Sequence, residues 1–269
     1  MDSVVDHESL RSLLDWQVSL GADEAILDAP LNRYALPDEP PRAALSRDPA
    51  APSLVAPVVA ATPRAQLELA IAQARAMAAA ATDLTGLAAA IADYGHCDLR
   101  QGARTTVFAD GLPAARVMII GEAPGREEDL VGRPFVGMAG QLLDRMLAAI
   151  GLDRTATEPA RAVYITNVSP WRPPANRSPE PDEIAMLLPF LERHVRLADP
   201  DIILLMGNTP CQALLGRSGI TRLRGQWAEV QGKPALPMVH PAYLLRQPAA
   251  KREAWADLLS LKARLAERS

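Results

Sequence analysis

The sequence has little of several features that mark particular classes of protein. Cysteine occurs only at Cys97 and Cys211 among the 269 residues, and no Cys-x-x-Cys pair of the kind that holds a metal is present. There is no run of about 18 apolar residues, as a membrane-spanning helix would require. Residues 1–8 are acidic, whereas a signal peptide begins with a basic and then an apolar stretch. We therefore expect a cytoplasmic protein with reduced thiols and no membrane association.

Acidic residues are scarce between residues 201 and 252. The net charge is −4, but residues 201–252 contain two acidic and seven basic side chains, whereas residues 1–60 contain ten acidic and four basic ones. A locally basic segment permits contact with the phosphates of a nucleic acid. A solvated basic face without a partner explains the same segment about equally well.

Proline and apolar residues divide the chain into three parts. Residues 8–20, within an N-terminal helical segment 1–36, have helical apolar spacing and are a candidate site for a protein partner. Residues 37–63 contain seven prolines and predict a flexible linker. The compact domain is expected over residues 64–269, where the chain is long enough to bury a full core.

Apolar runs of strand length alternate with helical patterns after residue 115. This alternation predicts an α/β domain, a three-layer α/β/α fold with a central, mainly parallel four-stranded sheet. Residues 64–93 are rich in alanine and predict two helices separated near Thr82 and Asp83. The expected strands are 116–120, 162–166, 201–206 and 235–239, and the expected helices are 138–150, 181–197, 208–216 and 250–266.

Three of the expected strands end in loops with polar side chains. The first strand leads into Gly-Glu-Ala-Pro-Gly (121–125), the second ends at Asn167, and the fourth ends at His240. Glycine and proline in the first loop allow a sharp turn and a close approach of the backbone to a ligand. Because ligands of such folds bind at the carboxyl ends of the strands, we expect these residues, with Phe135, to form one site.

Five motifs in this order resemble those of the uracil-DNA glycosylase superfamily, most closely its family 4, whose members usually carry an iron–sulfur cluster. The resemblance covers roughly residues 84–265. It implies a uracil-DNA glycosylase-like fold and a DNA repair hydrolase that flips uracil out of DNA and excises it. The motifs are Gly-Glu-Ala-Pro-Gly (121–125), Gly-Arg-Pro-Phe-Val-Gly (132–137), Thr-Asn-Val (166–168), Arg-Pro-Pro-Ala-Asn-Arg-Ser-Pro (172–179) and His-Pro-Ala-Tyr-Leu-Leu-Arg (240–246).

The resemblance assigns roles to residues at the strand ends. Phe135 would stack on the flipped base, and Asn167 would pair with uracil O4 and N3–H, because a carboxamide offers a donor and an acceptor side by side. His240 would donate a hydrogen bond to uracil O2 as the glycosidic bond breaks. Glu122 would position the water or support the positive sugar, with local acceptance of backbone N–H groups as the alternative. The expected catalytic residues are Glu122 and His240, and the expected uracil-binding residues are Gly121, Ala123, Phe135, Asn167 and His240.

Two motifs are candidates for DNA contact. Pulling a base out of the stack costs a few kcal/mol, so a side chain has to fill or grip the gap. Leu244 and Leu245 lie where the family has its DNA-inserting loop, which implies an apolar wedge, with a core contact at the start of a helix as the alternative. The residues expected to contact DNA are Arg172, Arg177, Tyr243, Leu244, Leu245 and Arg246.

The largest departure from family 4 concerns the iron–sulfur cluster. The four cysteine positions of the family correspond here to Tyr94, Cys97, Trp171 and Leu187. One thiol cannot hold a cluster that needs four thiolates. We therefore expect no cofactor and no bound metal, with Trp171 and Leu187 packed against Tyr94 in the place of the cluster.

Lysine is scarce as well, and none of Lys233, Lys251 and Lys262 falls in a motif. The motifs thus offer no amine nucleophile, which predicts a monofunctional glycosylase that leaves an abasic site, and we expect it to act as a monomer. A non-catalytic uracil-DNA-binding or polymerase-associated module is the alternative, although a pure binder would not need His240. A generic nucleotide-binding protein ranks last, because the Gly-x-Gly-x-x-Gly fingerprint and a P-loop are absent.

Overall fold

The computed structural model describes residues 62–267. The predicted helical segment 1–36 lies outside the described residues. The predicted linker 37–63 does so as well, except for its last two residues. Within residues 62–267, no helix is both long enough and apolar enough to cross a membrane.

Two alanine-rich helices open the described part of the chain, as residues 64–93 predicted. Thr62 is the N-cap of α2 (Pro63–Ala80), where its hydroxyl accepts a backbone N–H of the first turn. Asp83 caps α3 (Leu84–Asp93) in the same way, with its carboxylate 2.7 Å from a first-turn backbone nitrogen. The capping residue Asp83 therefore fixes the boundary between the two helices.

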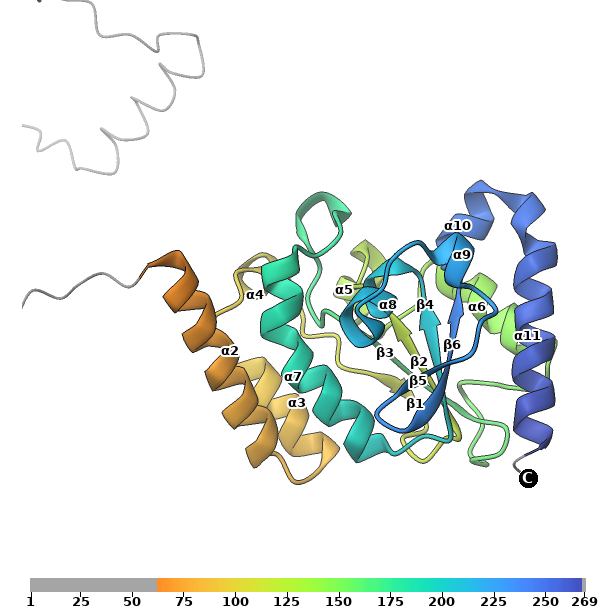
Figure 1. Ribbon diagram of the computed structural model, residues 1–269, viewed down its shortest axis with the longest axis horizontal. Coiled ribbons are helices and arrows are strands. Elements are labelled where there is room, and N and C mark those ends of the chain that lie inside the picture. Colours follow the sequence, from red (N-terminus) through yellow and green to blue (C-terminus); the bar gives the residue numbers. More distant parts are fainter. Residues whose placement is uncertain (1–61, 268–269) are drawn as a thin grey trace, which may run out of the picture. The chain divides into compact units, whose positions relative to one another are not determined.

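A six-stranded sheet with the order β1-β3-β2-β4-β6-β5 forms the centre of the domain (Figure 1). Its four middle strands are parallel and are the four that the apolar runs predicted. The sheet has six strands rather than four because β1 and β5 pair antiparallel at its edges. With two and three residues, these strands are too short to show an alternating pattern. The strands are β1 (Asp110–Gly111), β2 (Val117–Gly121), β3 (Val163–Asn167), β4 (Ile202–Met206), β5 (Ala228–Val230) and β6 (Lys233–Met238).

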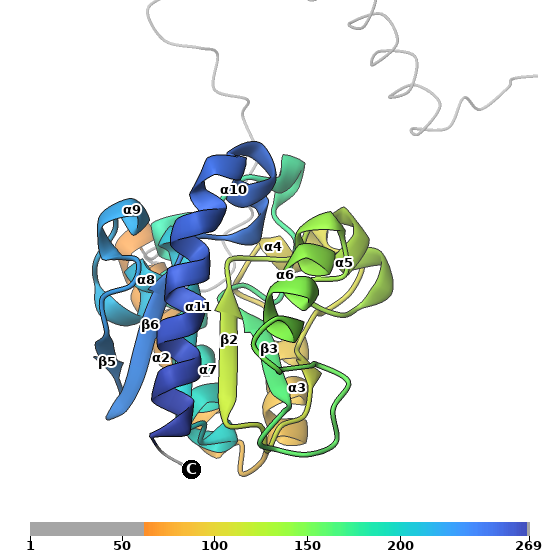
Figure 2. The same ribbon diagram turned by 90° about the vertical axis from the view of Figure 1, so that its right-hand side faces the viewer.

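Helices cover both faces of the sheet, as parallel strands require. Helices α6 and α11 pack on one face against Val117 and Ile119, and Figure 2 shows α11 lying across this face. Helices α7 and α8 pack on the other face against Met118 and Ile120. Alternate side chains of β2 thus serve two cores, which gives the predicted three layers. The four helices are α6 (Met138–Ala148), α7 (Pro181–Ala198), α8 (Asn208–Leu215) and α11 (Lys251–Ala266).

A third hydrophobic cluster lies where α2 and α3 pack against α7, on the side of the sheet opposite to α11 (Figure 1). We call it the Tyr94 cluster. It combines side chains of α2, α3 and α7 with those of the segments that follow α3 and β3. Its largest members are Tyr94, Trp171, Phe190 and Leu187, and Cys97 lies among them.

Short helices follow the carboxyl ends of three parallel strands. Helix α5 comes after β2, the 3₁₀ turn η2 after β3, and α10 after β6. The loops that carry the sequence motifs therefore meet at one edge of the sheet. The short elements are α4 (Leu99–Gly102), α5 (Arg126–Val131), η2 (Pro174–Asn176), α9 (Ile220–Leu223), α10 (Pro241–Arg246) and η3 (Pro248–Ala250).

Candidate active site

A cleft of about 510 Å³ lies at the carboxyl ends of β2, β3 and β6. Most of the predicted site residues line it, including both candidate catalytic residues. Gly121, Arg172, Leu244 and Leu245 are outside its lining. The predicted residues in its walls are Glu122, Ala123, Phe135, Asn167, Arg177, His240, Tyr243 and Arg246.

Gly121 leaves room for two predicted site residues to approach each other. It is the last residue of β2 and is paired in register with Asn167 of β3. A Cβ atom at Gly121 would clash with Asn167 Oδ1 and would lie 2.5 Å from Phe135 Cε2. Only glycine fits there, so the carboxamide of Asn167 and the ring of Phe135 meet at the end of β2.

The imidazole of His240 completes this group. Its ring centroid lies 5.3 Å from that of Phe135, and the two ring planes differ by 25°. Phe135 is 5% exposed and has a φ of 54°, a left-handed backbone conformation that is rare for a bulky residue. Phe135, Asn167 and His240 thus come from three separate segments and face the same cleft.

The carboxamide of Asn167 is available to a ligand. Asn167 is 6% exposed, but it makes no side-chain hydrogen bond within residues 62–267, and neither of its polar atoms is sealed from solvent. The side chain of a strand-end asparagine that served only to cap a turn would form hydrogen bonds with nearby backbone groups. Asn167 therefore has one donor group and one acceptor free for recognition.

His240 is held as a neutral hydrogen-bond donor. It is the N-cap of α10, and its Nδ1 accepts a hydrogen bond from the backbone N–H of Ala242 at 3.2 Å. Burial lowers the pKa of His240 below its usual value, against a smaller opposing effect of the Glu122 carboxylate. A neutral ring that accepts at Nδ1 carries its proton on Nε2, so Nε2–H can donate to a ligand.

The two nearby carboxylates have different roles. Glu122 lines the cleft, and within the described part of the chain its carboxylate accepts no hydrogen bond. The alternative role considered for it, accepting local backbone N–H groups, belongs instead to Glu128. Glu128 accepts from the backbone nitrogens of Gly125 at 3.1 Å, Val136 at 2.9 Å and Gly137 at 2.8 Å. It therefore joins the loop after β2 to the segment of Phe135.

Glu128 is a site residue that the sequence prediction missed. It lines the cleft and is the third residue of α5, whose N-cap is Gly125. The N-cap glycine followed three residues later by glutamate in Gly-Arg-Glu-Glu (125–128) was a visible helix-start signal, and Glu128 does accept from the Gly125 nitrogen. Its contact with residues 136 and 137 had no counterpart in local sequence.

The predicted DNA-contacting arginines differ in how much of their charge is available. Arg246 lies exposed at the end of α10, and Arg172 donates to Asn176 Oδ1 at 2.7 Å. Within residues 62–267 neither arginine pairs with a carboxylate. Arg177 instead makes two hydrogen bonds to Glu183, at 2.8 and 2.7 Å. Because Glu183 compensates its charge, Arg177 is the weakest phosphate-binding candidate of the three.

The structure corrects the expectation for one of the two leucines. Leu244 is 1% exposed and packs in the core with residues of α6 and α11, so it cannot contact DNA in this conformation. It matches the alternative of a core contact at the start of a helix. Leu245 is 37% exposed on the next position of α10, and its insertion into DNA stays a prediction.

The four residues that the resemblance matched to cluster ligands are packed together in the Tyr94 cluster. Tyr94, Cys97, Trp171 and Leu187 are each at most 1% exposed. The Tyr94 hydroxyl donates to the carbonyl of Ala70 at 2.9 Å, and Trp171 Nε1 donates to a threonine hydroxyl at 3.1 Å. Burial raises the pKa of the Cys97 thiol to about 11, so it is not a thiolate at neutral pH.

These residues do not fit an iron–sulfur cluster. They offer one neutral thiol where four thiolates are needed, and two aromatic rings and a leucine fill the space. Over residues 62–267, no group of three or more histidine, cysteine, aspartate or glutamate side chains is arranged to hold a metal ion.

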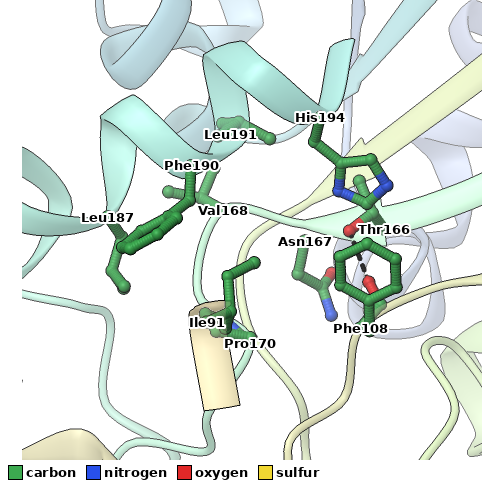
Figure 3. Close-up of a pocket in the computed structure, with 10 residues that line it drawn as sticks. All are labelled: Ile91, Phe108, Thr166, Asn167, Val168, Pro170, Leu187, Phe190, Leu191 and His194. Atoms are coloured by element: carbon green, nitrogen blue, oxygen red, sulfur yellow. Dashed lines mark hydrogen bonds between the residues drawn. The ribbon is translucent and has the colours of Figure 1, made fainter. Parts of the chain in front are cut away.

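A small cavity of about 20 Å³ is lined both by residues of this cluster and by Asn167 (Figure 3). Asn167 lines both this cavity and the cleft, so it lies between them. Figure 3 shows Leu187 and Phe190 on one side of the cavity and His194 on the other. Burial lowers the pKa of His194 to about 3, and its Nε2 lies 2.9 Å from the Tyr164 hydroxyl. The strand that carries Asn167 is therefore backed by neutral, packed side chains.

Comparison with known proteins identifies the family. A model of the Uracil DNA glycosylase superfamily matches residues 108–259. The chain is 39% identical over 170 residues to the type-4 uracil-DNA glycosylase of Archaeoglobus fulgidus, covering 60% of this chain and 82% of that protein. Identity to the type-4 enzyme of Thermotoga maritima is 39% over 153 residues, covering 56% and 77%. A DNA polymerase of Bacillus phage SP01 is 36% identical over 138 residues, which is 51% of this chain and 14% of the polymerase. The chain belongs to the uracil-DNA glycosylase superfamily.

Proposed function

We propose that the protein is a uracil-DNA glycosylase, which hydrolyses the bond between uracil N1 and deoxyribose C1′ in DNA and leaves an abasic site. The observation that carries this proposal is the meeting of Phe135, Asn167 and His240 in one cleft at the carboxyl edge of the sheet. Similarity to type-4 uracil-DNA glycosylases over most of their length supports the same activity.

The free carboxamide of Asn167 supports selection of uracil. Its N–H group donates to uracil O4, and its oxygen accepts from N3–H. Cytosine presents a donor and an acceptor in the reverse order, so both contacts would be lost and buried polar groups left unpaired. The ring of Phe135 offers a flat surface on which the base stacks.

His240 supports departure of the base. As the N1–C1′ bond breaks, its electron pair leaves with uracil, and negative charge grows on O2. The neutral imidazole donates Nε2–H to that oxygen, while the Ala242 backbone N–H keeps Nδ1 as the acceptor. A preorganised donor in a site shielded from water is worth a few kcal/mol of transition-state stabilisation.

Glu122 supports the attack of water. Its carboxylate is not engaged by neighbouring backbone groups of the described chain, so it can orient a water molecule and stabilise the positive charge that develops on the sugar. The water oxygen bonds to C1′, and one water proton is released as the sugar hydroxyl forms. Loss of Glu122 should therefore affect the chemical step more than base binding.

We propose that hydrolysis is the only reaction. Lysine is absent from the described lining of the cleft, and Lys233 is paired with Asp199 at 2.6 Å. A Schiff base with the sugar, and hence strand cleavage, would need such an amine. Borohydride treatment during turnover should trap no enzyme–DNA adduct; a covalent adduct would contradict this part of the proposal.

We further propose that the domain works without an iron–sulfur cluster. The packing of Tyr94, Trp171 and Leu187 supports this, because these side chains occupy the ligand positions and bury one another. Iron and sulfide assays on protein purified without oxygen should give far less than one iron per chain. A brown preparation with about four irons per chain would contradict it.

The similarity to a phage DNA polymerase favours one second candidate, a uracil-DNA-binding module that works with a polymerase and has no activity of its own. Such a module would keep Phe135 and Asn167, which recognise the base. It would not need His240, whose donor serves the departing anion. The presence of His240 at the cleft therefore favours the enzyme.

The deciding experiment is excision of uracil from a single-stranded oligonucleotide, followed by alkaline cleavage of abasic sites. Wild type should release uracil, while Asn167→Asp and His240→Ala should lose most activity. Matched controls are Asn208→Asp, where Oδ1 only accepts backbone hydrogen bonds, and His96→Ala, an exposed histidine bonded to Gln73. A wild type that binds uracil DNA tightly and never cleaves the bond would favour the binding module.

A further inference from the structure

The backbone of Phe135 adopts a conformation that its neighbours have to maintain. With a φ of 54°, it lies in the left-handed region, which a bulky side chain occupies only where surrounding contacts hold it. Its ring has to lie beside His240 if the flipped base is to stack there. The contacts of the Phe135 backbone therefore determine where the ring is presented.

The guanidinium of Arg154 makes two of these contacts from outside the cleft. Its Nη1 donates to the carbonyl of Pro134 at 3.0 Å, and its Nη2 donates to the carbonyl of Phe135 at 2.9 Å. The side chain is 10% exposed, so both hydrogen bonds are largely shielded from water. Because a guanidinium is planar and presents its donors in a fixed fork, it fixes two successive peptide groups at once.

Two carboxylates hold the guanidinium in turn. Nε of Arg154 donates to Asp144 at 2.7 Å, and Nη1 donates to Asp110 at 3.2 Å. Asp144 belongs to α6, and Asp110 belongs to β1, which pairs with β3. Since β3 ends at Asn167, the network links the backbone of Phe135 to the strand that positions Asn167. The network gives Asp110 a role, although this carboxylate is not part of the cleft lining.

The other side of the Phe135 backbone is equally constrained. A Cβ atom at Gly140 would clash with the carbonyl of Phe135, so the first turn of α6 packs directly against it. The next two backbone nitrogens, those of Val136 and Gly137, donate to Glu128. Arg154 thus holds the carbonyl groups and Glu128 holds the N–H groups of one short segment.

We propose that Arg154 is a positioning residue, which acts through the backbone of Phe135 to hold the phenyl ring where the flipped base stacks. The inference rests on the proposed function of the cleft and deepens it. A purely structural role for Arg154 would lower stability and leave the affinity for the base unchanged. The two roles are separated by measuring base binding in folded variants.

The test compares Arg154→Gln and Arg154→Lys with a matched control, Arg116→Gln. Arg116 also pairs with a carboxylate, Asp201 at 2.7 Å, and donates to the carbonyl of Leu265 at 3.2 Å, but it lies at the opposite end of β2. Each protein is studied well below its melting temperature. The measurements are the affinity for free uracil by ligand-observed NMR, the affinity for uracil-free DNA, and kcat and KM for excision.

We expect Arg154→Gln to weaken free uracil binding and to lower kcat, each by roughly tenfold, because a displaced ring loses stacking and alignment. Affinity for uracil-free DNA should stay within about twofold, because the phosphate-binding side chains are elsewhere. Arg154→Lys, which keeps the charge and one donor direction, should lie between wild type and Arg154→Gln. Arg116→Gln should change stability alone.

Uracil binding by Arg154→Gln that equals that of Arg116→Gln would overturn the inference and leave the proposed function intact. A wild type that neither binds nor releases uracil would overturn both. If Arg154→Gln does not fold, Asp144→Asn serves instead, because this carboxylate is 46% exposed and its loss loosens the same guanidinium. It should weaken uracil binding about threefold, and unchanged binding would contradict the inference.

Discussion

The cleft and the Tyr94 cluster are neighbouring regions that differ in whether their polar side chains have hydrogen-bond partners inside the protein. In the Tyr94 cluster, the tyrosine hydroxyl and the indole N–H of Trp171 both have partners inside the protein. In the cleft, Asn167 and Glu122 keep their side-chain polar atoms unbonded within the described residues, although Asn167 is almost as buried. The polar groups of the cluster are satisfied by packing partners, whereas Asn167 and Glu122 are left free for a ligand.

This difference separates the two kinds of mutational effect. Removing a free polar group from the cleft costs the protein little stability, because the group contributes no internal contact. Removing a side chain from the cluster costs stability and leaves the recognition groups in place.

The largest effect should come from His240→Ala. Loss of the donor to uracil O2 should lower kcat by about 10²- to 10³-fold. The free energy of unfolding should fall by only about 1 kcal/mol, which is the usual cost of losing an N-cap side chain such as the imidazole that accepts from Ala242. Single-turnover excision and thermal unfolding of the same preparation check both statements. A variant with normal kcat would remove His240 from the chemical step.

The opposite pattern is expected for Leu187→Ala in the Tyr94 cluster. Leu187 is 1% exposed, so truncation should cost about 2–5 kcal/mol of unfolding free energy. At a temperature where the variant is folded, kcat/KM should stay within about threefold of wild type. Denaturant unfolding checks the first expectation, with Leu259→Ala, which is 46% exposed, as the control. Equal losses in the two leucine variants would show that the cluster contributes no packing energy.

The buried histidines predict a loss of stability in acid. The pKa of His194 is lowered to about 3, whereas an unfolded chain binds the proton near pH 6.5. Below pH 6.5 the histidine is therefore protonated in the unfolded state and still neutral in the folded state. The free energy of unfolding then falls by up to about 1.4 kcal/mol per pH unit, until the pH reaches the pKa of His194 in the folded protein. His240, whose pKa is also lowered, adds to the same slope.

The variant that isolates this effect is His194→Gln, which has no titrating ring and still reaches the Tyr164 hydroxyl. Its unfolding free energy should fall less steeply between pH 6.5 and pH 4 than that of wild type. Denaturant unfolding at several pH values measures both slopes. Parallel curves for the two proteins would mean that other groups dominate the acid response.

The smallest effect is expected for Leu245→Ala. Its exposed side chain on α10 should contribute to DNA through apolar contact in the gap left by the flipped base. We expect excision from duplex DNA to fall by roughly threefold to tenfold, with a smaller change on single strands, which need no gap filled. Parallel assays on the two substrates measure the ratio. Equal changes on both would argue for a general surface contact.

Much of the fold follows from sequence because the signals are local. The four parallel strands are continuous apolar runs, and Asp83 caps α3 where the chain predicted a break. The edge strands were missed because they contain two and three residues. Helix α10 entered only as the alternative for Leu244 and Leu245, since its six residues carry little periodicity, although a proline at its first position was a start signal.

The site was predictable in its composition and less so in its contacts. Motifs at strand ends named Phe135, Asn167 and His240, because parallel topology brings strand ends together. The burial of Leu244 and the role of Arg154 depend on packing between elements far apart in the chain. The hydrogen bond from the Arg154 guanidinium to the carbonyl of Phe135 joins residues 19 positions apart, and no local sequence pattern predicts it.

The Tyr94 cluster also bears on how the protein matures in the cell. An iron–sulfur cluster has to be assembled and inserted after synthesis of the chain, and oxidants can destroy it. Tyrosine, tryptophan and leucine side chains are part of the polypeptide and need no such insertion. Under the proposal that the domain works without an iron–sulfur cluster, we expect it to reach its working form on folding alone, and its activity to be unchanged by iron starvation.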